Sequence, residues 1–336
     1  MTMPSGNNLE LTKAVLDSPY SILNNAIRMP LTNIAGPSYV QLESTTKCNY
    51  RCSHCIRSPT ENYNMSFDLF KSILDQLHCS RLRTQHVDLT GIGEPLLNPN
   101  LVSMVRLVKE KGFKTGFTTN FSLMKRPIAE ELINAGIDYI FISMDSANKE
   151  AFEKIRIGGD FEKTLSLIRS FVQMRDEIGS SKPILKLSVT LYKENLDEIF
   201  NLVNLAEELK VDSINFSRPI MRGEEFWKSV GSSLSTWKGF SGFNVSVGRY
   251  AIPLKRPQPC LALKGCFITY DGYLLPCNSL MQIAPRDEFN QYALGNLEHE
   301  DIYQIWRSNK YRKFRTLLTL GKRSSFCKHC PRPYQI

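Results

Sequence analysis

The sequence predicts an α/β protein built on a parallel sheet. Between residues 38 and 217, six apolar segments of strand length alternate with amphipathic helical segments. Such alternation is typical of βαβ units, whose parallel strands are joined by right-handed crossovers. A loop with three cysteines follows the first strand, at the end where barrel-like α/β folds place their active sites. Six units are too few to close an eight-stranded barrel.

The expected elements follow one another regularly along this stretch. Strands are expected at 38–43, 86–90, 115–119, 139–143, 184–191 and 213–216. Helices are expected at 66–77, 101–111, 127–135, 149–155, 161–176 and 196–209. Ser66 is the expected N-cap of the first helix, because a serine hydroxyl can accept from the free amides of a first turn.

The flanking segments lack this alternation. Residues 1–37 contain several prolines and allow short helices at 11–16 and from Ser18 onward. Residues 218–259 are rich in Gly, Ser, Pro and Trp and carry no sustained period. We therefore expect an N-terminal extension (1–37), an α/β core (38–217), a linker with substrate-cavity loops (218–259) and a C-terminal domain (260–336). Arg218 follows the sixth strand directly and is a candidate for substrate binding or proton transfer, or for a structural ion pair.

The loop after the first strand carries Cys48, Cys52 and Cys55 in Cys-x3-Cys-x2-Cys spacing. Three thiolates can bind one inorganic centre, but they leave one position open on a tetrahedral zinc ion or a cubane iron–sulfur cluster. An open position is where an exogenous ligand binds. The alternative is a disulfide, or a zinc loop whose fourth ligand comes from elsewhere, for example from His54.

A second group of cysteines lies in the C-terminal region. Residues 267–276 predict a β-hairpin that turns at Asp271-Gly272 and brings Cys260 and Cys277 to neighbouring positions. Cys327 and Cys330 follow in Cys-x2-Cys spacing. Two such cysteine pairs also suit a structural zinc ribbon.

Composition and charge show which classes of protein this sequence fits. Of the net charge of +9, most lies in residues 301–336, where nine Lys or Arg face one acid. Such a basic face can bind nucleic acid, an anionic substrate or an acidic protein, or it is simply a solvated helix. No nucleic-acid-binding motif accompanies the charge, so we do not expect a nucleic-acid-binding module. No apolar run reaches membrane-spanning length, and the N-terminus lacks a signal-peptide pattern. Nine cysteines without a secretion signal indicate metal binding in a reducing cytoplasm.

The cysteine loop resembles the signature of the radical S-adenosylmethionine (SAM) family. The resemblance implies that Cys48, Cys52 and Cys55 hold a [4Fe–4S] cluster whose fourth iron binds SAM. It implies a partial (β/α)6 barrel, similar to an incomplete TIM barrel. It also implies that SAM is cleaved to a 5′-deoxyadenosyl radical, which abstracts hydrogen from an unactivated C–H bond.

Residues at other strand ends match the SAM contacts of this family. The turn 91–95 (Gly-Ile-Gly-Glu-Pro) resembles the segment whose backbone binds the SAM amino group. Arg156 matches an arginine that pairs with the SAM carboxylate, with a surface helix charge as the alternative. His54 matches a residue that packs on the adenine, or it shields the cluster. The full expected SAM set is Gly91, Gly93, Glu94, Asn120, Ser143, Asp145, Arg156 and His54.

The C-terminal region resembles the SPASM/Twitch extension of the same family. It has the order Cys260-x11-Gly272-x4-Cys277, then Gly-Asn-Leu, Ile-Trp and a final Cys-x2-Cys. No cysteine follows Cys330, which departs from the full SPASM form toward the shorter Twitch form. The resemblance therefore implies one auxiliary [4Fe–4S] cluster, held by Cys260, Cys277, Cys327 and Cys330.

A fully ligated auxiliary cluster is expected to move electrons, so we expect net oxidation (dehydrogenation) of the substrate. The expected substrate is a small polar natural-product intermediate, with a ribosomal peptide as the competing candidate. Cys266 leaves three interpretations open: hydrogen donor in an epimerisation, additional cluster ligand, or small buried apolar side chain. A flavodoxin- or ferredoxin-type electron donor is expected to dock on Arg312, Lys313 and Arg315. The non-enzymatic alternative is a zinc-binding scaffold whose basic tail binds RNA.

Overall fold

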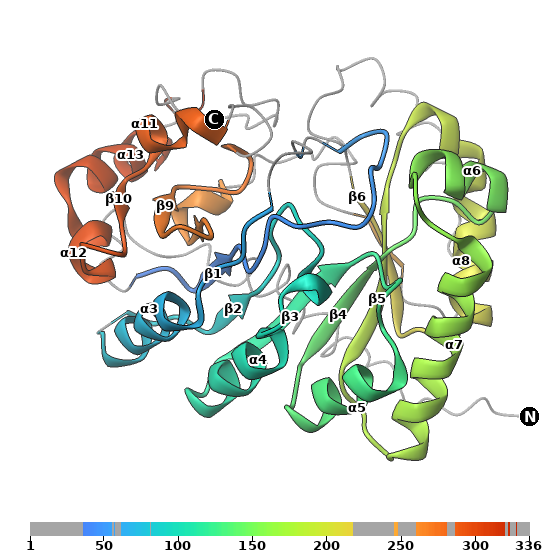
Figure 1. Cartoon of the computed structure of the whole chain (residues 1–336). Helices are drawn as coiled ribbons and strands as arrows, with labels where there is room; N and C mark the ends of the chain where they lie inside the picture. The colour runs from blue at the N-terminus through green and yellow to red at the C-terminus, as the bar shows by residue number, and fades with distance from the viewer. Residues whose placement is uncertain are drawn as a thin grey trace, which may run out of the picture.

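The computed structural model describes residues 36–55, 57, 62–80, 82–217, 245–247, 260–280, 286–319, 322 and 327. Figure 1 shows a curved sheet with helices along its outer side and the C-terminal elements beside α3 (Phe67–Cys79). The short helices expected before residue 36, Arg218 and Cys330 lie outside the described residues.

Strands and helices alternate along the core as predicted. The strands are β1 (Tyr39–Leu42), β2 (His86–Asp88), β3 (Lys114–Thr119), β4 (Tyr139–Ser143), β5 (Ile184–Thr190) and β6 (Ser213–Ser217). The helices after α3 are α4 (Leu101–Glu110), α5 (Arg126–Asn134), α6 (Lys149–Ile155), α7 (Phe161–Glu177) and α8 (Ile199–Glu208), and η1 (Pro95–Leu97) and η2 (Lys193–Glu198) are 3-10 turns. Every predicted strand and helix of the core is confirmed, with bounds that differ by a few residues.

The core strands form one parallel sheet in chain order, and the sheet continues at both ends. The order is β10-β9-β8-β1-β2-β3-β4-β5-β6-β7. Strand β7 (Val245–Val247) pairs parallel with β6, and β8 (Gly265–Ile268) pairs parallel with β1. The sequence does not predict β7, because three residues in a Gly- and Ser-rich stretch show no period.

The hairpin expected at residues 267–276 is confirmed. Strands β8 and β9 (Tyr273–Leu275) are antiparallel, and Gly272 lies in the turn with φ of +85°, a conformation that glycine adopts without steric strain. Strand β10 (Gly295–Asn296) completes the sheet. Because β8 extends the core sheet directly, the boundary at residue 260 stays a prediction.

The C-terminal helices pack against the first helix of the core. The remaining elements are η3 (Leu261–Leu263), η4 (Arg286–Glu288), α11 (Phe289–Tyr292), α12 (Ile302–Arg307) and α13 (Asn309–Thr319). The backbone N–H of Ile302 donates to the side chain of Gln76 in α3 at 2.9 Å. Of the residues expected to form a docking face, Arg312 and Lys313 are exposed, but Arg315 is 5% exposed and stacks on aromatic rings. The prediction that Arg315 lies on that face was therefore wrong.

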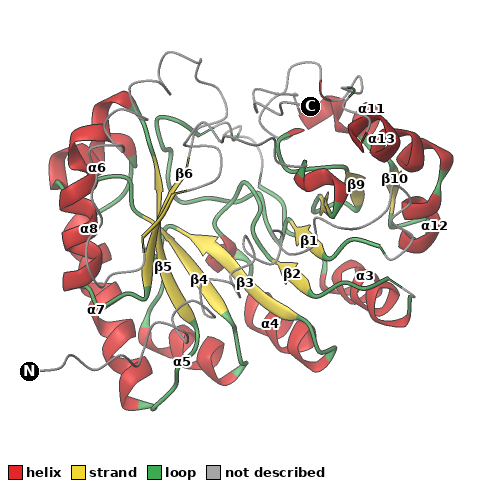
Figure 2. Cartoon of the chain, turned by 180° about the vertical axis from the view of Figure 1, so that it is seen from behind, coloured by secondary structure: helices red, strands yellow, loops and turns green. Residues whose placement is uncertain are grey.

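The two faces of the sheet differ sharply, and Figure 2 shows the helices gathered on one of them. In β5, Leu185, Leu187 and Val189 are fully buried in the apolar core. Alternate residues of a strand point to opposite faces, so Lys186, Ser188 and Thr190 lie on the concave face. Helix α3 covers the other face with Phe70, Ile73, Leu74 and Leu77, and Ser66 caps it by accepting from Leu69 N–H, as predicted. None of the described helices combines the length and apolar character needed to span a bilayer.

Candidate active site

The cysteine loop leaves the end of β1 and is fixed by its backbone. Arg51 N–H donates to the carbonyl of Ile157, and Ser53 N–H donates to the carbonyl of Ile155, both at 2.8 Å. Cys55 N–H donates to the carbonyl of Cys52 at 3.0 Å, which closes a tight turn between the two cysteines. These contacts hold the loop against the end of α6 without using the thiols.

A ring of polar side chains ties the same loop to the end of β3. Asn120 Nδ2 donates to Asn49 Oδ1 at 2.9 Å, and Asn49 Nδ2 donates to Ser122 Oγ at 2.9 Å. Ser122 Oγ in turn donates to Asn120 Oδ1 at 2.7 Å. Asn120 is therefore a loop anchor in the structure, and its contact with SAM stays a prediction.

The three thiols of the loop lie within electrostatic reach of one another. Burial raises the pKa of Cys52 to about 11, Arg156 lowers it, and the thiols of Cys55 and Cys48 raise it again. Burial also raises the pKa of Cys48. Across the described residues, no three His, Cys, Asp or Glu side chains converge as metal ligands. Binding of iron would have to displace the proton from each thiol and draw the sulfurs together. Metal binding by cysteine commonly requires both changes.

The predicted SAM-binding turn packs directly against the segment that leads to Cys48. A Cβ on Gly93 would lie 2.5 Å from the carbonyl oxygens of Lys47 and Thr45, so a larger residue would push the two segments apart. Glu94 N–H donates to Lys47 O at 2.6 Å. A Cβ on Gly91 would meet the side chain of Glu43 at 2.5 Å. The glycines are therefore required by close packing, whatever they bind.

The carboxylate of Glu94 fixes this turn to β3. It accepts from Thr119 Oγ1 and Asn120 N–H, both at 2.6 Å, and from Leu96 N–H at 3.2 Å. Glu94 is 2% exposed, and burial raises its pKa to about 7 although these hydrogen bonds lower it. The turn, the cysteine loop and the end of β3 thus form one hydrogen-bonded unit.

His54, Asp145 and Arg156 meet beside the cysteine loop. Arg156 Nη2 lies 2.6 Å from Asp145 Oδ2, and His54 Nε2 lies 3.9 Å from the same oxygen. Arg156 is 6% exposed, so it is not a surface helix charge. The His54 ring lies 5.2 Å from the ring of Tyr192. Ser143 is half-buried at the end of β4, two residues before Asp145.

Two buried nitrogen atoms in this group have no hydrogen-bond partner among the described residues: His54 Nδ1 and Arg156 Nε. An unpaired buried donor carries a desolvation cost that a ligand can relieve. A guanidinium with a free N–H can receive a carboxylate, and an imidazole can pack on a base. The residues at the loop therefore fit an iron–sulfur cluster and the amino-acid and adenine ends of SAM.

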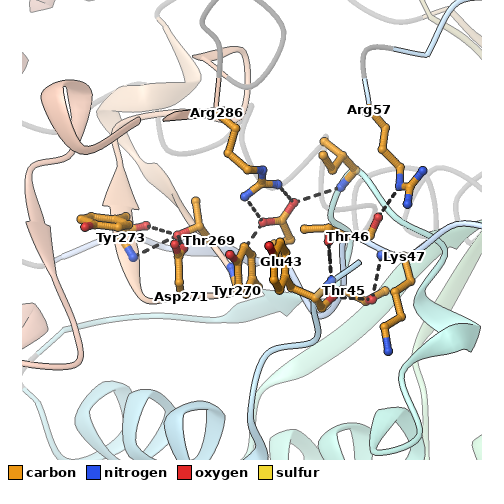
Figure 3. Close-up of polar contacts among 12 residues, drawn as sticks. Glu43, Thr45, Thr46, Lys47, Arg57, Thr269, Tyr270, Asp271, Tyr273 and Arg286 are labelled. Carbon is orange, nitrogen blue, oxygen red and sulfur yellow. Dashed lines mark hydrogen bonds and ion pairs between the residues drawn. The ribbon is translucent and has the colours of Figure 1, made fainter. Parts of the chain in front are cut away.

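A buried ion pair joins this site to the C-terminal hairpin (Figure 3), and the sequence interpretation missed it. Glu43 is 0% exposed and follows β1 directly. Arg286 binds it through both terminal nitrogens, at 2.7 and 3.0 Å. The backbone N–H groups of Ile92 and Tyr270 also donate to the Glu43 carboxylate, at 3.4 and 3.3 Å. One carboxylate thus connects the glycine turn with residues of the C-terminal region.

Arg286→Met is expected to lower the free energy of unfolding by about 3–5 kcal/mol, because it leaves a buried carboxylate without a counter-ion. Burial raises the pKa of Glu43 even beside Arg286. Since a protonated Glu43 needs no counter-ion, the loss should be largest at neutral pH and shrink as the pH falls. Chemical denaturation measures it. Arg126→Met, which removes exposed pairs with Glu130 and Glu177, is the control and should change the stability much less, because solvent screens exposed ion pairs. Equal losses in both variants, or no pH dependence, would refute the role of the pair.

Two cysteines of the second group, Cys260 and Cys277, lie near Tyr311 of α13. The thiols of Cys266, Cys277 and Cys260 all act electrostatically on its hydroxyl. Cys260, Cys277 and Cys327 are half-buried and pack against the core that contains Tyr311. Cys260 and Cys277 therefore lie near one buried hydroxyl, and their thiolates could serve as ligands of a cluster once iron displaces the protons.

Cys266 belongs to the outer face of the sheet. It pairs in register with Val40, and both side chains lie in the apolar core, whereas Phe267 lies in a separate cluster. Cys266 is 3% exposed, and burial raises its pKa to about 12. Its side chain faces α13 rather than the concave face, where alternate residues of β1 such as Gln41 lie.

Comparison with known proteins agrees with this geometry. The model of the radical SAM superfamily matches residues 42–212, half of the chain. The chain belongs to the radical SAM superfamily. The SPASM model, described as an iron–sulfur cluster-binding domain, matches residues 260–331 of this radical SAM protein. The two domains imply SAM and [4Fe–4S] clusters as cofactors, so the cofactor prediction is confirmed.

Two curated radical SAM relatives align over most of their length. The tungsten-containing aldehyde ferredoxin oxidoreductase cofactor-modifying protein of Pyrococcus furiosus is 28% identical over 299 residues, 82% of this chain and 83% of the relative. The AdoMet-dependent heme synthase of Methanosarcina barkeri is 24% identical over 87% of this chain and 89% of its own.

Among solved structures, Streptococcus suis SuiB bound to SAM superimposes with a TM-score of 0.67 and 17% identity, covering 98% of this chain and 84% of SuiB. The SAM-bound enzyme anSMEcpe gives a TM-score of 0.61, also with 17% identity, over 88% of each chain. At this identity the likeness shows the fold alone, and it confirms the predicted partial α/β barrel with a C-terminal extension.

Proposed function

We propose that this radical SAM enzyme removes two hydrogen atoms from a small, polar, anionic substrate held on the concave face of the sheet. When bound, SAM and its cluster supply the radical that takes the first hydrogen from carbon. The second hydrogen leaves as a proton and an electron, and the C-terminal cluster site is the electron acceptor. The residues assigned above to SAM and to the two clusters remain part of this proposal.

The proposal that the substrate is anionic rests on Lys186. It is 9% exposed on the concave face of β5, next to Phe141 of β4, whose ring centroid lies 5.6 Å from Nζ. Among the described residues its ammonium has no hydrogen bond and no ion pair. Burial lowers its pKa to about 8, and no carboxylate of the described residues offsets its charge. A buried cation without a partner is costly, and an anionic ligand would relieve that cost.

The position of Cys266 supports oxidation rather than epimerisation. A hydrogen donor must reach the substrate radical, but Cys266 faces α13 on the outer side of the sheet. The names of the two curated relatives, a cofactor-modifying protein and a heme synthase, support a small-molecule substrate. A peptide is the second candidate substrate, because SuiB, a neighbour in fold with a TM-score of 0.64, was solved with its precursor peptide.

The test supplies anaerobically reconstituted enzyme with SAM and a fractionated cell extract in deuterated water. Oxidation predicts a product two hydrogen atoms lighter and free of carbon-bound deuterium. A product of unchanged formula that carries deuterium at carbon would indicate epimerisation and overturn the proposal. If the modified product is a peptide, the substrate is the second candidate and not a small molecule.

Lys186→Met is then expected to raise KM by roughly 10- to 100-fold, because a hydrogen bond to a charged group contributes about 1.5–3 kcal/mol. Since the pKa of Lys186 is about 8, the wild-type KM should rise as the pH rises through that value and the ammonium loses its proton. Steady-state kinetics between pH 7 and 9 measure this. Lys114→Met, at an exposed position of β3, is the control. A pH-independent KM in the wild type would contradict the role of Lys186.

A further inference from the structure

Tyr311 is a fully enclosed side chain with a polar hydroxyl near the second cysteine group. It is 0% exposed, and its ring meets Trp306 edge to face at 4.6 Å. The guanidinium of Arg315 lies 4.4 Å from the same ring centroid and donates a hydrogen bond to the Trp306 carbonyl at 2.7 Å. These contacts from α12 and α13 hold the ring in one orientation.

The hydroxyl of Tyr311 has no hydrogen-bond partner among the described residues. Buried tyrosine hydroxyls almost always find one, because an unpaired buried hydroxyl costs free energy. The thiols of Cys266, Cys277 and Cys260 lie near enough to act on it electrostatically, as does the guanidinium of Arg315, which lies 4.4 Å from the ring centroid. These sulfurs are nearby acceptors with which the phenol could replace its water contacts, and a neutral thiol is a weak acceptor.

We propose that the Tyr311 hydroxyl donates a hydrogen bond to a sulfur atom of the auxiliary cluster and raises its reduction potential. Thiolate and sulfide sulfurs carry negative charge and accept hydrogen bonds well. A donor stabilises the reduced, more negative cluster more than the oxidised one, which favours uptake of an electron. The buried Arg315 acts in the same direction through its charge. Tyr311 is thus a positioning residue for electron transfer from the substrate radical.

The inference rests on the auxiliary cluster of the proposed function, but not on the identity of the substrate. It also explains why a tyrosine rather than a phenylalanine fills this apolar site. For packing alone, phenylalanine would serve better, since it buries the same ring without an unpaired hydroxyl.

The test is Tyr311→Phe in the full chain, with Cys48, Cys52 and Cys55 changed to alanine so that only the auxiliary cluster gives a signal. A redox titration followed by electron paramagnetic resonance measures its midpoint potential, which should shift to a more negative value. Tyr303→Phe is the matched control, since its hydroxyl is bound by Arg307 at 2.6 Å and it lies on α12. That variant should leave the potential unchanged. An unchanged potential in Tyr311→Phe with full iron content would overturn the inference.

Two further measurements keep the test decisive. The reduced cluster of the Tyr311-containing protein should show a coupled proton that exchanges in deuterated water, and the absence of this proton would also overturn the inference. The cluster-free Tyr311→Phe protein should melt at the same or a higher temperature than its parent, because it loses an unpaired hydroxyl. A lower melting temperature would indicate a structural role instead. A wild-type chain that binds no auxiliary cluster would overturn the proposed function together with the inference.

Discussion

Replacing both Cys260 and Cys277 with alanine is expected to separate SAM cleavage from substrate oxidation. The two thiols lie beside Tyr311 on the C-terminal side of the sheet, whereas the cysteine loop is held by α6 and β3. Loss of the second site should therefore leave the first intact. Iron should fall from about eight to about four atoms per chain, as expected for loss of one of two cubane clusters. SAM cleavage should continue, but the oxidised product should disappear.

The measurement combines iron analysis with quantitation of 5′-deoxyadenosine and of product. Cys79→Ala is the matched control, because Cys79 is exposed at the end of α3 and belongs to neither cysteine group. If the double variant forms product at the wild-type rate, the C-terminal cysteines do not accept the electron. If it keeps all its iron, they do not hold a cluster.

Changing Cys48, Cys52 and Cys55 to alanine is expected to have the opposite effect. The chain should keep the auxiliary cluster, about four iron atoms, and lose every response of its electron paramagnetic resonance spectrum to SAM. The fold should persist, because the loop is fixed through Arg51 N–H, Ser53 N–H and the side chain of Asn49 rather than through the thiols.

Circular dichroism and the thermal transition of the cluster-free protein check that fold. A triple variant whose spectrum still changes on addition of SAM would place the SAM-binding cluster elsewhere. Cys79→Ala should retain the wild-type response. Loss of the response in Cys79→Ala would mean that the spectrum reports general damage and not ligation.

The elements of the core could be predicted from sequence because each carries a local signal. Helix α3 begins where Ser66 offers a side-chain oxygen to Leu69 N–H, and its apolar residues recur at helical spacing. Strand β4 is found at the predicted bounds, since Tyr-Ile-Phe-Ile-Ser is a short apolar run followed by a polar loop. The placement of three cysteines in one loop after β1 could be predicted for the same reason, because their spacing is a local property of the sequence.

The parts that could not be predicted depend on pairs distant in sequence. Glu43 and Arg286 are separated by 243 positions, and neither stands in a motif. The sequence of β5 does not show that Lys186 lies on the concave face of the sheet, where its ammonium is buried beside Phe141 and has no ion pair with any of the described residues. Arg315 belongs to a basic stretch of sequence that predicts a docking face, but its side chain is buried against aromatic rings. Charge counted along a helix does not show which turn faces inward.

The most direct measurement is the fate of SAM in the presence of the reconstituted wild-type chain and dithionite under anaerobic conditions. The cysteine loop and the surrounding His54, Asp145 and Arg156 predict methionine and 5′-deoxyadenosine in equal amounts, formed only when the reductant is present. Intact SAM in a sample that holds both clusters in full would contradict this prediction.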